Sequence, residues 1–182
     1  LWQEEHLTQT RRQLIDDVQN TALLADAAQI FKLGPKNAHE ISQNLEVYDA
    51  PALAAWQLYD GVLYEAAKFA QIFSYGACAQ DGQGQADQSQ GLQRQLEELT
   101  LVFSALFGPV RLTDLITPHR LSGSVKLPGQ GTVASIWSKA LKELLTQQLS
   151  GHVVVDLRSA EYGAMYRPTR GSDCLLLNIG VA

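Results

Sequence analysis

Cysteine and long apolar runs are both scarce in this chain. Of 182 residues only Cys78 and Cys174 are cysteines, and no Cys-x-x-Cys pair occurs, so the spacing predicts neither a disulfide framework nor a thiolate zinc site. No apolar stretch approaches the roughly 18 to 20 residues that a membrane-spanning helix needs, and the polar start Leu1-Trp2-Gln3-Glu4-Glu5 does not resemble a secretory signal. We therefore expect a cytoplasmic protein without a membrane partner.

Histidine is equally sparse, which bears on metal binding. His6, His39, His119 and His152 are scattered along the chain, and they form neither a His-x-x-x-His pair nor a two-His-one-carboxylate pattern. The sequence therefore predicts no metal site and no cofactor.

Positive charge is in deficit over the whole chain but not in every part of it. The net charge is −5, which disfavours a generally polycationic nucleic-acid binder. Residues 1–108 carry six Lys/Arg against 14 Asp/Glu, whereas residues 109–182 carry eight against five. A local basic face can therefore exist on an acidic protein, and the alternative is a solvated mixture of charges.

What the chain does contain is apolar periodicity. Hydrophobic residues make up 46% of it, enough for a substantial core in a single domain over residues 1–182. Apolar residues at helical spacing predict helices over about 7–18, 21–31, 35–45 and 133–149, and the spacing resumes over 92–99.

The remaining segments predict strands and one loop. Leucine-rich and β-branched runs predict buried strands at 152–157 and 175–179, while the apolar run 101–107 fits either a buried strand or the end of a buried helix. The Gln- and Gly-rich segment 77–91 has no large apolar residue to pack and predicts a flexible exposed loop. The expected fold class is α+β, an irregular mixture of helices packed around a small mixed sheet.

Four separated blocks of the sequence resemble one family. They are Gly61-Val62-Leu63-Tyr64; the run from Ser104-Ala105-Leu106-Phe107-Gly108-Pro109 through Thr117-Pro118-His119-Arg120-Leu121-Ser122-Gly123; Trp137; and Val154-Val155-Asp156-Leu157-Arg158-Ser159-Ala160-Glu161-Tyr162. In this order they resemble the YaaA-like peroxide stress family, in particular its actinobacterial branch, over about residues 7–168. The resemblance implies a bacterial stress protein that binds DNA and helps limit iron-dependent oxidative damage, and it leans against an enzyme.

The chain departs from the family pattern at both ends. Family members are typically longer, beginning with a strand and a Ser-Pro loop and ending with a Lys…Arg-Gly element. Neither pattern is recognisable here, so we expect this chain to lack those segments.

The residues Leu33-Gly34-Pro35-Lys36 separate two predicted helices. Together with those helices, over residues 20–46, they resemble the helix-hairpin-helix element attributed to this family. Gly allows unusual backbone angles, and Pro suits the first turn of a helix. Backbone N–H groups at such a hairpin can bind a phosphate oxygen, while Lys32 and Lys36 would neutralise charge without reading bases. An ordinary helix–helix connection is the alternative.

The richest polar set comes from the two most family-like segments. Arg111, Arg120 and Arg158 would suit a phosphate or carboxylate, with His119 and Glu161 as weak acid–base candidates. Arg158 also follows a predicted strand, and ligands tend to bind at the carboxyl ends of strands in open α/β sheets. In the alternative interpretation Arg158 pairs with Asp156 or Asp114, and His119 is a hydrogen-bonded core residue.

The leading hypothesis is thus a stress protein that binds double-stranded DNA. The residues expected to contact it are Lys32, Gly34, Lys36, Arg111, Arg120 and Arg158. One alternative is an enzyme that acts on a phosphorylated or nucleotide-like small molecule in an Arg/His cleft. The other is a non-catalytic interaction module.

Overall fold

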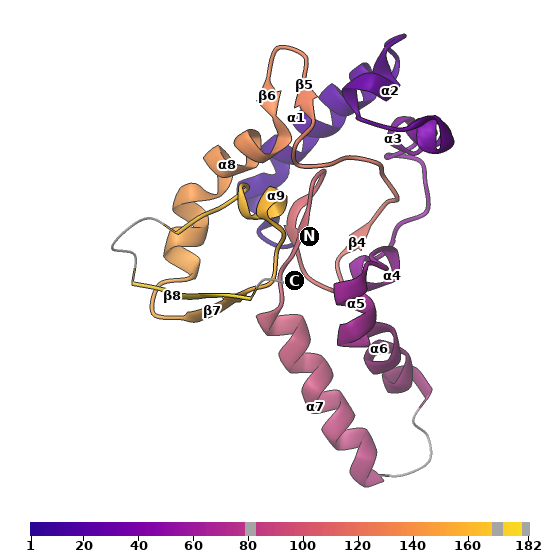
Figure 1. The fold of residues 1–182 in the computed structure, drawn as a ribbon. Coiled ribbons are helices and arrows are strands. Elements are labelled where there is room, and N and C mark those ends of the chain that lie inside the picture. The colour runs from indigo at the N-terminus through magenta and orange to yellow at the C-terminus, as the bar shows by residue number, and fades with distance from the viewer. Residues whose placement is uncertain (79–82, 169–172, 180–182) are drawn as a thin grey trace.

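The computed structural model describes residues 1–78, 83–168 and 173–179, with side chains described outside 74–90. Its helices are α1 (Glu4–Ala22), α2 (Ala27–Ile30), the 3₁₀ helix η1 (Pro35–Glu40), α3 (Ile41–Leu45), α4 (Ala55–Leu58), α5 (Val62–Ala67), α6 (Phe69–Cys78), α7 (Gln83–Leu99), α8 (Val133–Gln148) and α9 (Ala160–Gly163). Its strands are β1 (Leu53–Ala54), β2 (Val102–Ser104), β3 (Gly108–Val110), β4 (Leu115–Ile116), β5 (Lys126–Leu127), β6 (Gly131–Thr132), β7 (Val153–Asp156) and β8 (Leu175–Asn178). The expected α+β class is confirmed (Figure 1).

The core is built on α1 and α8. The apolar stripe of α1 is buried, including Leu7, Leu14 and Val18, because these residues recur on one helical face. From α8, Trp137 and Leu141 are fully buried in the same core. The N-cap of α8 is Thr132, whose hydroxyl accepts the N–H of Ser135 at 3.1 Å.

The strands are short and, in the described parts of the chain, form four two-stranded sheets rather than the one small sheet expected. The pairs β1–β4, β2–β3 and β5–β6 are antiparallel, and β7–β8 is parallel. In Figure 1, α6 and α7 lie side by side and extend away from the rest of the molecule, while the β5–β6 hairpin projects beside α1.

Three expectations need correction. The predicted helix over 21–31 is reduced to α2, because α1 continues through Ala22. The predicted loop over 77–91 is largely helical: α6 runs to Cys78 and α7 begins at Gln83, with 79–82 outside the described residues. Gln and Ala favour a helix, and in α7 their preference outweighs the cost of Gly84 and Gly91. The strand β7 is only partly buried, because Val153 and Val155 are exposed.

None of the described helices is long and apolar enough to cross a bilayer.

Candidate nucleic-acid interface

The site candidates from two distant segments lie together around the loop Thr117–Ser124. This loop, which we call the 117–124 loop, contacts the hairpin segment 31–44 on one side and α9 on the other. Two residues hold this loop in place. His119, on the loop itself, binds the β2–β3 hairpin, and Asn44 of the hairpin segment binds the backbone of the loop.

His119 fastens the 117–124 loop to the β2–β3 hairpin. Its Nδ1 lies 2.9 Å from the carbonyl oxygen of Thr117, which can only accept, so this nitrogen carries the proton. Nε2 then accepts the hydroxyl of Ser104 at 3.1 Å, and the ring meets Phe107 edge-on. Burial lowers the pKa of His119, so its neutral form is favoured. Both ring nitrogens are engaged, as in the core-histidine interpretation.

Arg120 points away from His119 towards the hairpin segment. Its Nε lies 2.9 Å from a carboxylate oxygen of Glu40, and its side chain is half exposed. The backbone beside it is held by Asn44, whose Oδ1 accepts the N–H of Arg120 at 2.8 Å and whose Nδ2 donates to its carbonyl at 2.9 Å. Asn44 is fully buried, and its amide bonds both the N–H and the carbonyl of Arg120, as a neighbouring strand would.

Lys32 makes the second connection between hairpin segment and loop. Its ammonium donates to the carbonyl and to the hydroxyl of Ser124, each at 3.0 Å. Lys32 has φ +58, in the left-handed region. The N–H of Leu33 donates to Ala28 and the N–H of Lys32 donates to Gln29, so α2 ends in a Schellman turn.

Gly34 differs from the expectation that it supplies an unusual backbone angle. It has φ −70 and ψ 163, which any residue adopts, and it precedes Pro35 at the start of η1. The left-handed position is taken by Lys32 two residues earlier, and sequence reasoning missed this because Lys rarely occupies it. Gly34 and Lys36 are both exposed, and a side chain added at Gly34 would meet nothing within 4 Å.

Glu161 reaches the same loop from α9. Its Oε1 accepts the hydroxyl of Ser122 and, at 2.8 Å, the N–H of Ser124. The pKa of Glu161 is lowered, chiefly by the hydrogen bond from Ser122, with a further contribution from the charge of Lys32. Lys32, His119, Arg120 and Glu161 are thus brought together.

Arg158 lies elsewhere and is engaged within the molecule. Nε and Nη2 each lie 2.8 Å from one of the two carboxylate oxygens of Asp156, and Nη2 also donates to the carbonyl of Tyr166 at 2.9 Å. Its guanidinium carbon stands 4.2 Å from the centre of the Phe103 ring. This is the pairing with Asp156 allowed by the alternative interpretation.

A cavity of about 560 Å³ adjoins Arg158 at the carboxyl end of β7. It is lined by Asp156, Arg167, Cys174 and Asn178 among others, but neither His119 nor Arg120 contributes to it. The Arg/His cleft required by the enzyme alternative is therefore not assembled in this cavity.

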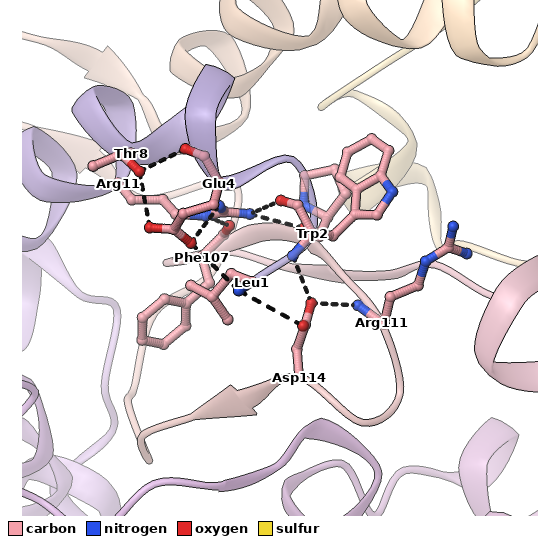
Figure 2. Close-up of polar contacts among 9 residues, drawn as sticks. Leu1, Trp2, Glu4, Thr8, Arg11, Phe107, Arg111 and Asp114 are labelled. Atoms are coloured by element: carbon pink, nitrogen blue, oxygen red, sulfur yellow. Dashed lines mark hydrogen bonds and ion pairs between the residues drawn. The ribbon is translucent and has the colours of Figure 1, made fainter.

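Arg111 holds the end of α7. Its Nη1 donates to the carbonyls of Glu98 and Thr100, and its backbone N–H donates to Asp114 at 2.8 Å (Figure 2). Unpaired carbonyls at a helix C-terminus are satisfied by such a cation.

Arg11 is the charged residue whose position sequence reasoning missed. It lies on the buried face of α1 and is only 3% exposed. Figure 2 shows it among backbone oxygens: Nε donates to Phe107 at 2.9 Å, and Nη2 donates to Trp2 at 2.8 Å and to Pro109 at 3.1 Å. The available signal was its spacing, four residues after Leu7 and three before Leu14, which places it on the buried stripe.

The aromatic residues Trp56, Tyr59 and Tyr64 pack against the core. Tyr59 and Tyr64 stack at 5.3 Å, and burial raises the pKa of Tyr64 to about 12. In the described parts of the chain no three His, Cys, Asp or Glu side chains gather as ligands of a metal ion would.

Comparison with known proteins places this arrangement in a family. A family model described as peroxide stress protein YaaA matches residues 82–177, which include the 117–124 loop and α9. A UPF0246 protein of Streptomyces coelicolor is 33% identical over 142 residues, covering 78% of this chain and 48% of the relative. A UPF0246 protein of Corynebacterium glutamicum is 30% identical over 166 residues, covering 88% and 58%. An uncharacterized protein of Campylobacter jejuni is 29% identical over 150 residues, covering 82% and 53%.

The chain therefore spans about half the length of the curated relatives that it matches. The matched region contains three of the four sequence blocks that carried the resemblance, and residues of two of them meet where the 117–124 loop contacts α9. The chain belongs to the peroxide stress protein YaaA family, which includes the UPF0246 proteins.

Proposed function

We propose that this chain binds double-stranded DNA through its phosphate backbone, without reading base sequence, and thereby helps limit iron-dependent damage during peroxide stress. The main support is that the hairpin segment contacts the 117–124 loop through two cations. Lys32 bonds Ser124, and Arg120 pairs with Glu40. These contacts put four exposed cations on adjoining segments: Lys32, Lys36, Arg120 and Lys126.

The local charge favours an anion despite the acidic chain. Glu40 pairs with Arg120, and Glu161 of α9 accepts hydrogen bonds from the 117–124 loop, so two carboxylates lie beside these cations. Phosphate contacts from Lys and Arg supply affinity and orientation but little sequence information. Arg111 and Arg158 are not part of the proposal, because internal carbonyls and carboxylates engage them.

Fluorescence anisotropy with a labelled duplex across a salt series tests the proposal. Affinity should fall steadily as salt rises, because bound cations release counterions from DNA. Lys36→Glu should weaken binding about tenfold or more and flatten the salt dependence, since it replaces an attraction with a repulsion. Lys142→Glu on α8 is the matched control, because it makes the same charge change at another exposed site. Equal affinity of the two variants would exclude the hairpin segment as the DNA contact.

The protective role is tested separately. Plasmid DNA exposed to ferrous iron and peroxide should be nicked less in the presence of the wild-type chain than of Lys36→Glu. Protection that is equal for both would show that it does not depend on DNA binding at this site.

A further inference from the structure

The turn Ser122-Gly123-Ser124 is occupied by a carboxylate. The hydroxyl of Ser122 and the N–H of Ser124 both donate to the same oxygen of Glu161. The ammonium of Lys32 is bonded to the carbonyl and hydroxyl of Ser124, so a cation is fixed to the same turn. Two donors on one carboxylate oxygen, with a cation close enough to lower the pKa of that carboxylate, are groups that would also suit a phosphate oxygen.

Backbone hydrogen bonds that do not involve Glu161 also hold this turn. The N–H of Val125 donates to the carbonyl of Ser122 at 3.1 Å, and the N–H of Ala134 donates to that of Gly123 at 2.8 Å. The first bond closes the turn just before β5, and the second ties it to the first turn of α8. Glu161 belongs to the separate short helix α9, so its carboxylate can leave while the turn stays in place.

The turn is also reachable from solvent. Ser122, Ser124 and Glu161 are half-buried, and Lys32 is exposed. Gly123 lies against Glu161, since a Cβ added at Gly123 would meet Cγ of Glu161 at 3.5 Å, an ordinary van der Waals distance. An incoming anion therefore meets the carboxylate at the surface and not in a sealed core.

We propose that the Ser122–Ser124 turn and Lys32 form an oxyanion site for a phosphate group, with the Glu161 carboxylate as an internal competitor that the phosphate displaces. The inference rests on the proposed function in that Lys32 belongs to both. The phosphate is either a diester of DNA or a monoester or free phosphate, since the same oxygen chemistry serves each.

Inorganic phosphate is the first probe, followed at the backbone amide of Ser124 by ¹⁵N NMR. Glu161→Gln keeps an acceptor for Ser122 and Ser124 but removes the competing charge. It should bind phosphate about tenfold or more tightly than wild type, with the Ser124 resonance moving on titration, because hydrogen bonds to charged groups are roughly twice as strong. Glu143→Gln, an exposed residue of α8, removes the same charge elsewhere and should match wild type.

A second variant assigns the effect to the turn. Adding Ser122→Ala to Glu161→Gln should remove most of the gain, and the NMR spectrum reports whether the fold is kept. If Glu161→Gln and Glu143→Gln bind phosphate equally, or if the Ser124 amide does not respond, the site does not exist.

Repeating the comparison with duplex DNA distinguishes the two sources of phosphate. A parallel gain in DNA affinity for Glu161→Gln identifies the diester as the ligand. A gain for phosphate alone identifies a monoester or free phosphate, and it leaves the site standing even if no variant binds DNA. DNA binding that depends on Lys36 but not on Glu161 or Ser122, with no phosphate gain, supports the proposed function and overturns this inference.

Discussion

At the scale of single residues, Gly108 shows why the sequence Phe107-Gly108 needs glycine at its second position. Gly108 has φ +70, and a Cβ there would lie 2.6 Å from Cζ3 of Trp137. Trp137 is itself fully buried and donates its indole N–H to the carbonyl of Ala105 at 2.8 Å. The indole therefore packs directly on the backbone of the β2–β3 turn.

Gly108→Ala should lower the free energy of unfolding by about 2 to 4 kcal/mol, because it combines backbone strain with a clash against a buried ring. Urea denaturation measures this loss. Gly163→Ala is the matched control: it lies in α9, nothing stands within 4 Å of its added Cβ, and its stability should stay within about 0.5 kcal/mol of wild type. A loss at Gly108 no larger than that at Gly163 would contradict the packing argument.

His119 makes stability depend on pH. Because burial lowers its pKa in the folded state, the unfolded chain binds the proton more readily. Stability should therefore be full above the unfolded value of about 6.5 and decline below it, by up to about 1.4 kcal/mol per pH unit. The carboxylates whose pKa is lowered, including Asp156 and Glu161, add their own loss only at lower pH.

Urea denaturation at pH 7.5 and pH 5.5 tests this effect. His119→Gln should show a smaller difference in unfolding free energy between the two pH values than wild type, whereas His152→Gln, at an exposed site, should keep the wild-type difference. Identical pH dependence in wild type and His119→Gln would remove His119 as the cause.

At the scale of elements, helix positions could be read from the sequence where an apolar stripe was long. The stripes of α1 and α8 led to both helices, with ends shifted by a few residues. The segment 83–91 was misjudged because a helix with few apolar residues leaves no apolar stripe in the sequence, so only weak helix propensities indicate it. Buried polar residues such as Arg11 and Asn44 were missed because their partners are backbone oxygens or N–H groups that come from distant segments.

Arg11 joins α1 to the β2–β3 hairpin, so its loss should uncouple the two elements. Arg11→Met keeps much of the volume but leaves the carbonyls of Phe107 and Pro109 without a donor, which should cost about 2 to 4 kcal/mol of unfolding free energy. Arg12→Met, one residue on and exposed, should change it by less than about 0.5 kcal/mol. Chemical denaturation of both variants makes the comparison, and equal losses would show that Arg11 does not couple the elements.

At the scale of the whole molecule, the α+β class followed from the mixture of patterns, but the arrangement of the strands did not. Near-continuous apolar strands are typical of sheets covered on both faces. In β7–β8 the register pairs Val153 with Leu175 and Val155 with Leu177, and all four side chains are between 46% and 64% exposed. Sequence patterns show that a face is apolar, whereas what covers it depends on tertiary contacts.

This exposed face should bind a hydrophobic dye. The chain should enhance ANS fluorescence, and the double variant Val155→Thr/Leu177→Thr should lose most of that signal, because it makes the face more polar and places a residue of high strand propensity in each strand. Val62→Thr/Leu99→Thr is the matched control, since those residues are even more exposed but lie on different helices. An equal decrease in both double variants would show that the dye does not report on β7–β8.

The contacts of the candidate residues could not be predicted from the sequence. Lys32, Arg120 and Glu161 were named from sequence, whereas the bond from Lys32 to Ser124 and the pairing of Arg120 with Glu40 were not. Sequence spacing cannot show which residues contact one another when they lie almost a hundred positions apart. The turn at the end of α2 directs the hairpin segment, and residue propensities do not predict that a lysine takes its left-handed position.

Lys32, with its left-handed backbone, is a position where stability and anion binding favour different residues. A lysine at φ +58 costs on the order of 1 kcal/mol relative to glycine, which adopts this conformation freely. Selection for thermal stability alone would thus enrich glycine or asparagine at position 32, whereas selection for anion binding would retain lysine. A variant library sorted once for each property should separate at this position, making residue 32 a place where the fold is kept less stable than it could be.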